Sequence, residues 1–247
     1  MDTNMDTNMN TMMNANEEKL AKNAYPGRGI VVGMTPDLRN LVQVYWIMGR
    51  SENSRNRVFV REGDEVKTRA FIESKMTDPS LIIYYPVRTV NNVHIVTNGD
   101  QTDTIARYIS EGKSFEEALL TRQYEPDAPN YTPRISAAIL YKGDSSSFVM
   151  SILSTVENNP SEEKKAFFTS RTFTPGEGKC IHTYKGDGNP LPSFEGVPYT
   201  VTVGNNIEET ARRYWDMLNQ ENRVALLVKH INVENGNVDI HIINRHA

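Results

Sequence analysis

Residues 49–57 form a stretch of hydrogen-bond donors suited to binding an anion. The stretch reads Gly-Arg-Ser-Glu-Asn-Ser-Arg-Asn-Arg, so the three guanidinium groups of Arg50, Arg55 and Arg57 lie close together in the chain. A guanidinium presents a planar fork of N–H donors that fits two oxygens of a phosphate. The spacing therefore predicts a phosphate-binding loop. The alternative is a solvated basic turn in which Glu52 pairs with one of the arginines.

A fourth arginine, Arg28, lies between two glycines in the sequence Tyr-Pro-Gly-Arg-Gly, just before the apolar run 30–32. Glycine has no side chain to keep a ligand away from the backbone, so Arg28 could lie directly beside a bound molecule. The alternative is an ordinary turn before an edge strand.

Two further polar clusters follow predicted strands. Residues 97–103, Thr-Asn-Gly-Asp-Gln-Thr-Asp, lead into a predicted helix that Asp100 or Thr102 could cap, and the same side chains could contact a ligand. Residues 124–135 contain three prolines, which favour a rigid loop over a helix. A carboxylate held in such a loop, Glu125, has less freedom than a surface glutamate.

The histidines and the single cysteine show no spacing typical of metal ligands, so we expect neither a metal nor another cofactor. Cys180 and His182 are two residues apart in a predicted strand, 179–184. They could form a nucleophile pair, but a small buried thiol is the favoured interpretation.

Composition excludes several classes of protein. The chain has 27 basic and 31 acidic residues, which argues against a general nucleic-acid-binding protein and favours a locally basic pocket. No apolar run reaches the length needed to span a membrane. A single cysteine is typical of a reducing compartment, so we expect a soluble cytoplasmic protein.

The apolar pattern predicts many strands and few helices, hence an α+β fold with sheets packed face to face and helices outside. Helices are expected after Asp100, from Ser114 towards Arg122 and after Asn206, and residues 157–165 are read as a polar connection. Strands are expected at 30–32, 41–48, 57–60, 81–85, 93–96, 135–141, 147–156, 179–184, 197–203, 223–233 and 238–243.

The first 24 residues are of low complexity and begin with Met-Asp-Thr-Asn twice over. This composition predicts a disordered tail over residues 1–24. No linker divides the remainder, so residues 25–247 are expected to form a single domain.

Four motifs in this order resemble the archaeal-type inosine monophosphate (IMP) cyclohydrolase family. They are Tyr-Pro-Gly-Arg-Gly, Gly-Arg-Ser-x-x-Ser-Arg-Asn-Arg, Thr-Asn-Gly-x-Gln-Thr-Asp and Thr-Pro-Arg-Ile. The resemblance implies a four-layer αββα sandwich similar to the N-terminal-nucleophile hydrolases. It also implies an enzyme that closes the purine ring in the last step of IMP biosynthesis. The substrate would be a small purine ribotide, 5-formamidoimidazole-4-carboxamide ribotide, and we expect a homo-oligomer.

The motifs and the resemblance together predict the site residues. Tyr84, near the end of the predicted strand 81–85, and Glu125 are expected to be catalytic. The residues expected to bind substrate are Arg28, Arg50, Ser51, Arg55, Arg57, Arg88, Asn98, Asp100, Asn130 and Arg134.

Two other functions remain open at this point. One is an amidohydrolase of the N-terminal-nucleophile type, which would need a free N-terminal Ser, Thr or Cys, and none stands at residues 25–28. The other is a purine-nucleotide-binding module without catalysis, whose phosphate contacts would look the same.

Overall fold

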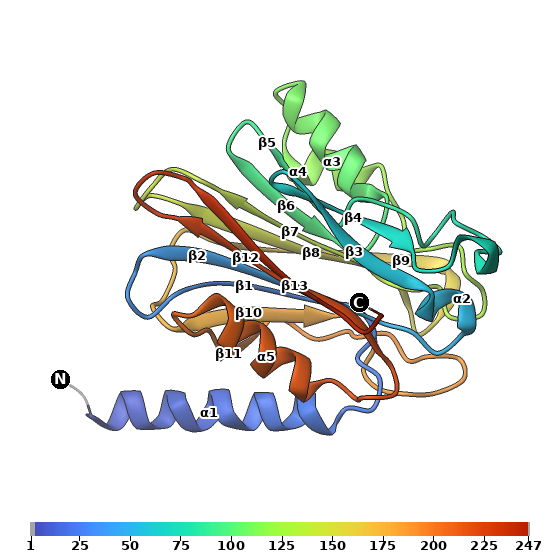
Figure 1. Cartoon of the computed structure of the whole chain (residues 1–247), viewed down its shortest axis with the longest axis horizontal. Helices are drawn as coiled ribbons and strands as arrows, with labels where there is room; N and C mark the ends of the chain where they lie inside the picture. Colours follow the sequence, from blue (N-terminus) through green and yellow to red (C-terminus); the bar gives the residue numbers. More distant parts are fainter. Residues whose placement is uncertain (1–2, 247) are drawn as a thin grey trace.

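Antiparallel strands form two sheets that lie one above the other in the computed structural model, which describes residues 3–246 (Figure 1). The first sheet has six strands in the order β11-β10-β1-β2-β12-β13. Its strands are β1 (Gly29–Met34), β2 (Asn40–Met48), β10 (Glu177–His182), β11 (Tyr199–Thr202), β12 (Arg223–Asn232) and β13 (Val238–Asn244).

The second sheet has seven strands in sequence order, from β3 to β9. They are β3 (Arg57–Glu62), β4 (Glu65–Ala70), β5 (Val87–Val90), β6 (Val93–Thr97), β7 (Arg134–Leu140), β8 (Ser147–Val156) and β9 (Asn159–Ser170). The predicted α+β class and most of the predicted strands are confirmed.

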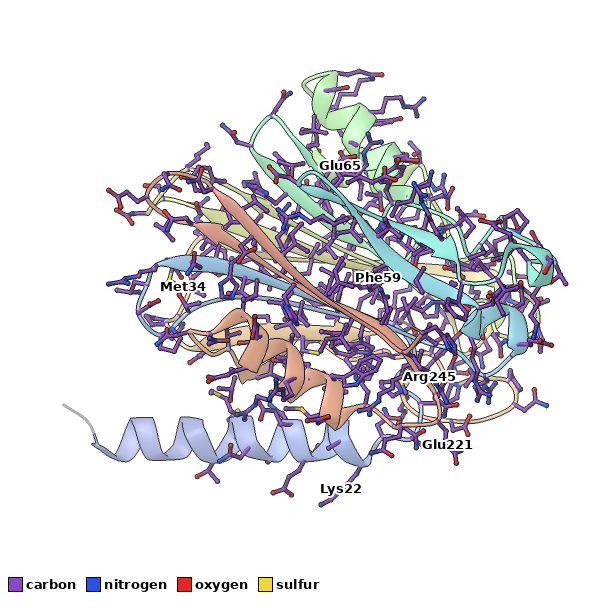
Figure 2. All side chains as sticks on the ribbon, viewed as in Figure 1. Lys22, Met34, Phe59, Glu65, Glu221 and Arg245 are labelled. Atoms are coloured by element: carbon purple, nitrogen blue, oxygen red, sulfur yellow. The ribbon has the colours of Figure 1, made fainter. Side chains whose placement is uncertain are left out.

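The main core lies between the sheets, and strand β2 shows why. Its odd-numbered apolar residues, such as Tyr45 and Ile47, belong to the cluster shared with the second sheet. Its even-numbered residues, such as Val44 and Trp46, belong to the cluster on the outer face. Because successive side chains of a strand point to opposite faces, a strand buried on both faces appears as a continuous apolar run. Figure 2 shows side chains filling the space between the sheets, with Phe59 among them.

Helices pack on the outer face of each sheet. α1 (Thr3–Lys22) and α5 (Ile207–Met217) lie against the first sheet, and α3 (Gln101–Ser110) and α4 (Phe115–Leu120) lie against the second. The predicted caps of α4 and α5 are present, since Ser114 closes a capping box and Asn206 Oδ1 accepts from the backbone of Glu209. None of the helices within residues 3–246 is long and apolar enough to cross a membrane.

Residues 81–85 do not form the predicted strand. The segment consists of turns and bends, although Ile82 and Tyr84 are buried as an alternating pattern would require. The segment makes no regular strand ladder and is instead hydrogen-bonded to Thr68 of β4. The backbone N–H of Thr68 donates to the Tyr84 carbonyl, and its hydroxyl donates to the Ile82 carbonyl. The prediction that residues 81–85 are largely buried is therefore confirmed, whereas the prediction that they form a β-strand is wrong. Strands β4, β5 and β9 were not predicted, because polar residues interrupt or replace their apolar pattern. The expected polar connection at 157–165 is therefore wrong, since β9 begins at Asn159.

The prediction of disorder over residues 1–24 is also wrong for most of the segment, because α1 spans Thr3–Lys22; residues 1–2 lie outside the described part of the chain. The later turns of α1 bury Met13, Leu20 and Glu17. The Glu17 carboxylate forms an ion pair with Arg213 of α5 and accepts from the backbone N–H of Thr202 at 2.7 Å. Contacts with distant parts of the chain thus stabilise a helix that its own composition does not predict.

We expect the substitution Glu17→Ala to destabilise the protein, because it leaves Arg213 and the Thr202 N–H without their shared acceptor. Arg213 is partly exposed, so the loss should be about 1–2 kcal/mol, equivalent to a fall of about 2–8 °C in Tm for a chain of this size. Thermal denaturation followed by circular dichroism measures the change. Glu18→Ala, one residue along and exposed, is the control. Equal melting temperatures for both variants and the unchanged chain would contradict the docked helix.

Candidate active site

A pocket of about 350 Å³ lies where several chain segments meet beyond the strand ends. Its walls come from the segment before β1, the segment 50–57 after β2, residues 78–82, the Pro-rich loop 125–130 and the residues that follow β10. Four of the site residues predicted from the sequence place charged side chains in the pocket lining. They are Arg28, Arg50, Arg57 and Glu125.

Glu125 is the buried carboxylate of this pocket, with 1% of its surface exposed. Its Oε2 lies 3.5 Å from Nη2 of Arg28, and its Oε1 accepts from Nδ2 of Asn98 at 3.4 Å. The backbone N–H of Glu125 donates to the Thr132 carbonyl across the Pro-rich loop at 2.9 Å. The side chain is therefore fixed from both the loop and the second sheet.

Asn98 is itself fully buried and all its polar atoms are engaged. Its Nδ2 also donates to the Pro133 carbonyl, and its Oδ1 accepts from the backbone of Ile135 and from Nε2 of Gln101. Gly99 allows this packing, since a Cβ there would come within 2.7 Å of the Gln101 side chain. Asn98 thus supports the carboxylate of Glu125 and does not line the pocket.

Burial raises the pKa of Glu125 to about 7, against the opposing positive charges of Arg28 and Arg134. Burial lowers the pKa of Arg28, but the combined electrostatic effect of Glu125 and the nearby tyrosines, Tyr184, Tyr84 and Tyr25, outweighs it. The net shift is therefore upwards and the guanidinium stays charged. A carboxyl group with a pKa near 7 can both take and give a proton at neutral pH.

Arg57 is a buried cation without a carboxylate partner among residues 3–246. Its Nε donates to the Ser54 carbonyl at 2.8 Å and its Nη2 lies 3.5 Å from the Met48 carbonyl, while Nη1 has no hydrogen-bond partner. Burial lowers its pKa from the usual value. A buried guanidinium with a free donor is costly in an empty pocket and favourable beside an anion.

Tyr84 does not line the pocket and is buried, with 5% of its surface exposed. Its hydroxyl is 2.7 Å from the hydroxyl of Tyr45 on β2. Burial raises its pKa, and the charges of Arg57 and Arg28 oppose that rise. The phenol is therefore protonated at neutral pH, and it lies close enough to both arginines for their positive charges to act on its pKa.

Arg50 lies at the rim of the pocket. Its Nη1 donates to Asp187 Oδ1 at 2.5 Å and to the Gly188 carbonyl at 3.0 Å, and its guanidinium lies over the ring of Tyr25. The neighbouring Ser51 is the N-cap of the single-turn helix α2 (Glu52–Arg55). The rim is thus polar and partly exposed, in contrast to the buried interior around Glu125.

Several predicted site residues lie elsewhere. Arg55 Nε donates to the Gly49 carbonyl and Nη2 to Asn222, so Arg55 braces the segment after β2 and does not face the pocket. Arg88, on β5, pairs with Glu65 and Asp103 outside the pocket. Arginine count alone did not distinguish binding groups from structural ones.

Asp100 and Arg134 lie outside the pocket, whereas Asn130 lines it. Asp100 forms no side-chain cap for α3 and instead pairs with Arg122 and Arg134, so its predicted capping role is wrong. Arg134 is buried beside Gln101 and its charge reaches Glu125. Asn130 lines the pocket, and its Oδ1 accepts from the backbone of Leu191.

The structure adds three polar residues that the sequence did not single out. The hydroxyl of Tyr184, a pocket residue, is hydrogen-bonded to that of Thr132, which donates to Asp127 Oδ2 at 2.5 Å. Asp127 also accepts from the backbone N–H of Thr132. The position of Asp127 between two prolines could have indicated a carboxylate held in a rigid loop. Tyr184 follows a β-strand and has the sequence pattern of an ordinary core residue.

The alternative nucleophile pair is not supported by the geometry. Cys180 is buried, its pKa is raised to about 12 by burial, and its Sγ is 3.2 Å from the hydroxyl of Tyr199. His182 Nδ1 bonds the Tyr184 carbonyl instead of the thiol. Within residues 3–246, no three His, Cys, Asp or Glu side chains come together as a metal site.

Comparison with known proteins identifies relatives of the chain. The sequence model of a family described as "IMP cyclohydrolase-like protein" matches residues 25–236. A protein named IMP cyclohydrolase from Methanosphaera stadtmanae is 30% identical over 165 residues, which are 65% of this chain and 74% of that protein. The protein of the same name from Methanocella arvoryzae is 28% identical over 78% of this chain and 86% of its own length. That from Methanopyrus kandleri is 36% identical over 45% of this chain and 57% of its own length.

We expect the Glu125 carboxyl group to titrate near pH 7, and the substitution Arg28→Met to raise that pKa further by removing the nearest positive charge. Nuclear magnetic resonance of side-chain carboxyl carbons measures both values, with Glu125→Gln identifying the resonance. Glu116→Gln, a half-buried residue of α4 that does not line the pocket, is the control. Titration of Glu125 near its ordinary value of about 4.3 would contradict the described burial.

Proposed function

The chain belongs to the IMP cyclohydrolase-like family, and on that premise we propose that it is an IMP cyclohydrolase. Its reaction closes the purine ring of 5-formamidoimidazole-4-carboxamide ribotide and releases water. The carboxamide nitrogen bonds to the formyl carbon and loses one proton, and the formamido nitrogen loses a second as its double bond to that carbon forms. The formyl oxygen leaves with both protons as water.

The buried guanidinium of Arg57, with its unused Nη1 donor, is the observation that carries this proposal. A ribotide brings a phosphate that can accept from Arg57 and from Arg50 at the rim, where further N–H donors of Arg50 remain. Ser51 and Ser54 border the same side of the pocket. The Ser51 hydroxyl is an additional donor, whereas the Ser54 hydroxyl already donates to the Ser51 carbonyl. The phosphate end of the substrate would thus lie along the segment after β2.

The ring-closing end of the substrate would face Arg28 and Glu125. Both reacting groups are on one imidazole ring, so the protein needs mainly to fix their rotamers and move protons. Glu125, with a pKa near 7, takes a proton from the carboxamide nitrogen. Tyr84, which stays protonated and is close to the charges of Arg57 and Arg28, is the proposed proton donor to the formyl oxygen.

The proposal also covers the layers of the fold, the extent of the domain and the assembly of the chain. We propose that the two sheets, with α1 and α5 on one side and α3 and α4 on the other, are a four-layer αββα sandwich resembling the N-terminal-nucleophile hydrolases. Residues 25–247 are proposed as a single domain, against which α1 packs, that works as a homo-oligomer in the cytoplasm.

Incubation of the purified chain with the formylated ribotide tests the activity, with IMP followed by chromatography. We expect IMP to form without added metal or redox cofactor. If the ribotide binds but no IMP forms, the chain is a nucleotide-binding module and the proposed activity is wrong.

The substitution Arg50→Ala should raise KM about tenfold or more, because a charge-assisted hydrogen bond to phosphate is lost. Arg57→Lys, which keeps the charge and removes the fork, should also weaken binding. Steady-state kinetics measure both effects. Arg88→Ala is the matched control, since Arg88 pairs with Glu65 outside the pocket. Equal KM values for Arg50→Ala and the control would contradict the phosphate position.

Tyr84→Phe and Glu125→Gln remove proton-transfer groups with little change of shape, so each should lower kcat about 10²-fold or more while the substrate still binds. In the unchanged protein, kcat/KM should rise with pH through about 7, as the carboxyl of Glu125 becomes a carboxylate able to act as base. That limb should be missing in Glu125→Gln. Near-full kcat in both variants would place the acid and base elsewhere.

A further inference from the structure

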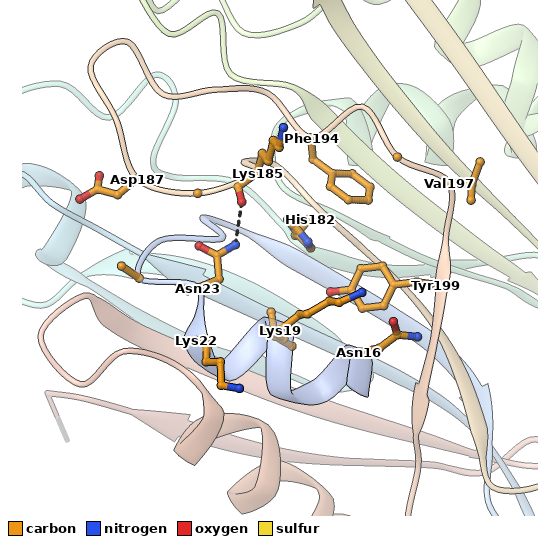
Figure 3. Close-up of a pocket in the computed structure, with 14 residues that line it drawn as sticks. Asn16, Lys19, Lys22, Asn23, His182, Lys185, Asp187, Phe194, Val197 and Tyr199 are labelled. Carbon is orange, nitrogen blue, oxygen red and sulfur yellow. Dashed lines mark hydrogen bonds between the residues drawn. The ribbon is translucent and has the colours of Figure 1, made fainter. Parts of the chain in front are cut away.

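A second and larger cavity, of about 740 Å³, lies on the outer side of the first sheet. Figure 3 shows its walls: the end of α1 with Lys19 and Asn23, the loop that carries Lys185 and Phe194, and Tyr199 of β11, with His182 between them. Its volume is in the range of small-molecule sites.

This cavity is separate from the candidate active site, because no residue lines both. The loop after β10 lies between them. Asp187 of that loop borders the larger cavity, and its carboxylate accepts from Arg50 at the rim of the active site. The family match begins at residue 25, so the wall formed by α1 lies outside the matched region.

Three lysines give the larger cavity a positive charge. They are Lys19, Lys22 and Lys185, and the single acidic residue among the lining residues is Asp187, which Arg50 already engages. Lys22 pairs with the exposed Glu18. Within residues 3–246, the ammonium groups of Lys19 and Lys185 have no ion-pair or hydrogen-bond partner.

Aromatic rings form one side of the cavity. The ring centroid of His182 lies 4.3 Å from that of Phe194 and 5.7 Å from that of Tyr199. Burial lowers the pKa of His182 to about 4, so its ring is neutral. Since its Nδ1–H donates to the Tyr184 carbonyl, Nε2 is left as an acceptor. Phe194 and Tyr199 are only partly buried, so ring surface remains for a ligand.

We propose that this cavity binds a nucleoside monophosphate, at a site additional to the one that would hold the ribotide. The phosphate would be bound by the ammonium groups of Lys19 and Lys185, which have no other counter-ion. The base would stack against Phe194, as bases do on aromatic side chains in other proteins. Tyr199, whose ring is inclined by 62° to that of Phe194, would meet the base at an angle. A simple anion would leave the aromatic side uncovered, and an uncharged aromatic molecule would leave the lysines unpaired.

Isothermal titration calorimetry with AMP on the full chain tests this proposal. We expect AMP to bind, and the double variant Lys19→Glu/Lys185→Glu to weaken that binding at least tenfold. Lys164→Glu is the matched control, since Lys164 is an exposed lysine of β9 that borders neither cavity. Arg57→Lys, altered in the active site, should keep the AMP binding that the lysine variant loses.

Inorganic phosphate is the second probe and should bind at least tenfold more weakly than AMP, because it cannot stack. If the double variant has a lowered Tm, the single variant Lys185→Glu, on a surface loop, replaces it in the binding measurement. Lys185→Glu alone should also weaken AMP binding. Three results would each overturn the proposal: no AMP binding at millimolar concentration, AMP binding unchanged by the lysine substitutions, or phosphate binding as tightly as AMP.

Discussion

Removal of the Glu125 carboxylate from water, beside the guanidinium of Arg28, is the constraint on which the rest of the site depends. Burial of an ion pair costs several kcal/mol per charge unless further hydrogen bonds complete its surroundings. Here they are supplied by Asn98, which Gln101 and the backbone of Ile135 hold in place. The start of α3, the start of β7 and the Pro-rich loop therefore have to meet at one point.

The burial of Glu125 also determines which proton transfers the site can perform at neutral pH. A carboxyl group with a pKa near 7 exchanges protons at neutral pH, while the phenol of Tyr84 stays protonated in nearly the same surroundings. Arg57 adds a buried positive charge that lacks a carboxylate, so an anionic ligand completes the balance of charge. The two sheets make this possible because they hold three distant segments of chain rigidly at their strand ends. An isolated loop could not keep these charges out of water.

Local patterns were enough to predict β2 and the capped helices, whereas the grouping of Arg28, Arg57 and Glu125 was predicted with the help of the family resemblance. Local patterns failed where distant contacts decide the outcome. The helix α1 has a weakly apolar sequence, and it is the docking of Glu17 that stabilises it. Residues 81–85 have the burial of a strand but bond to a threonine. Arg55 is only two residues from Arg57 in the same motif, yet its guanidinium contacts Asn222, because the fold decides which guanidinium reaches the pocket.

A crystal structure of the chain with IMP would test the central claim most directly. The account predicts that the phosphate of IMP accepts from Arg57 and Arg50, and that the newly closed ring lies against Arg28 and Glu125. The predicted distance from Arg57 Nη1 to a phosphate oxygen is that of a hydrogen bond, about 2.7–3.2 Å. IMP bound with its phosphate away from both arginines, or a purine ring out of reach of Glu125, would contradict the account.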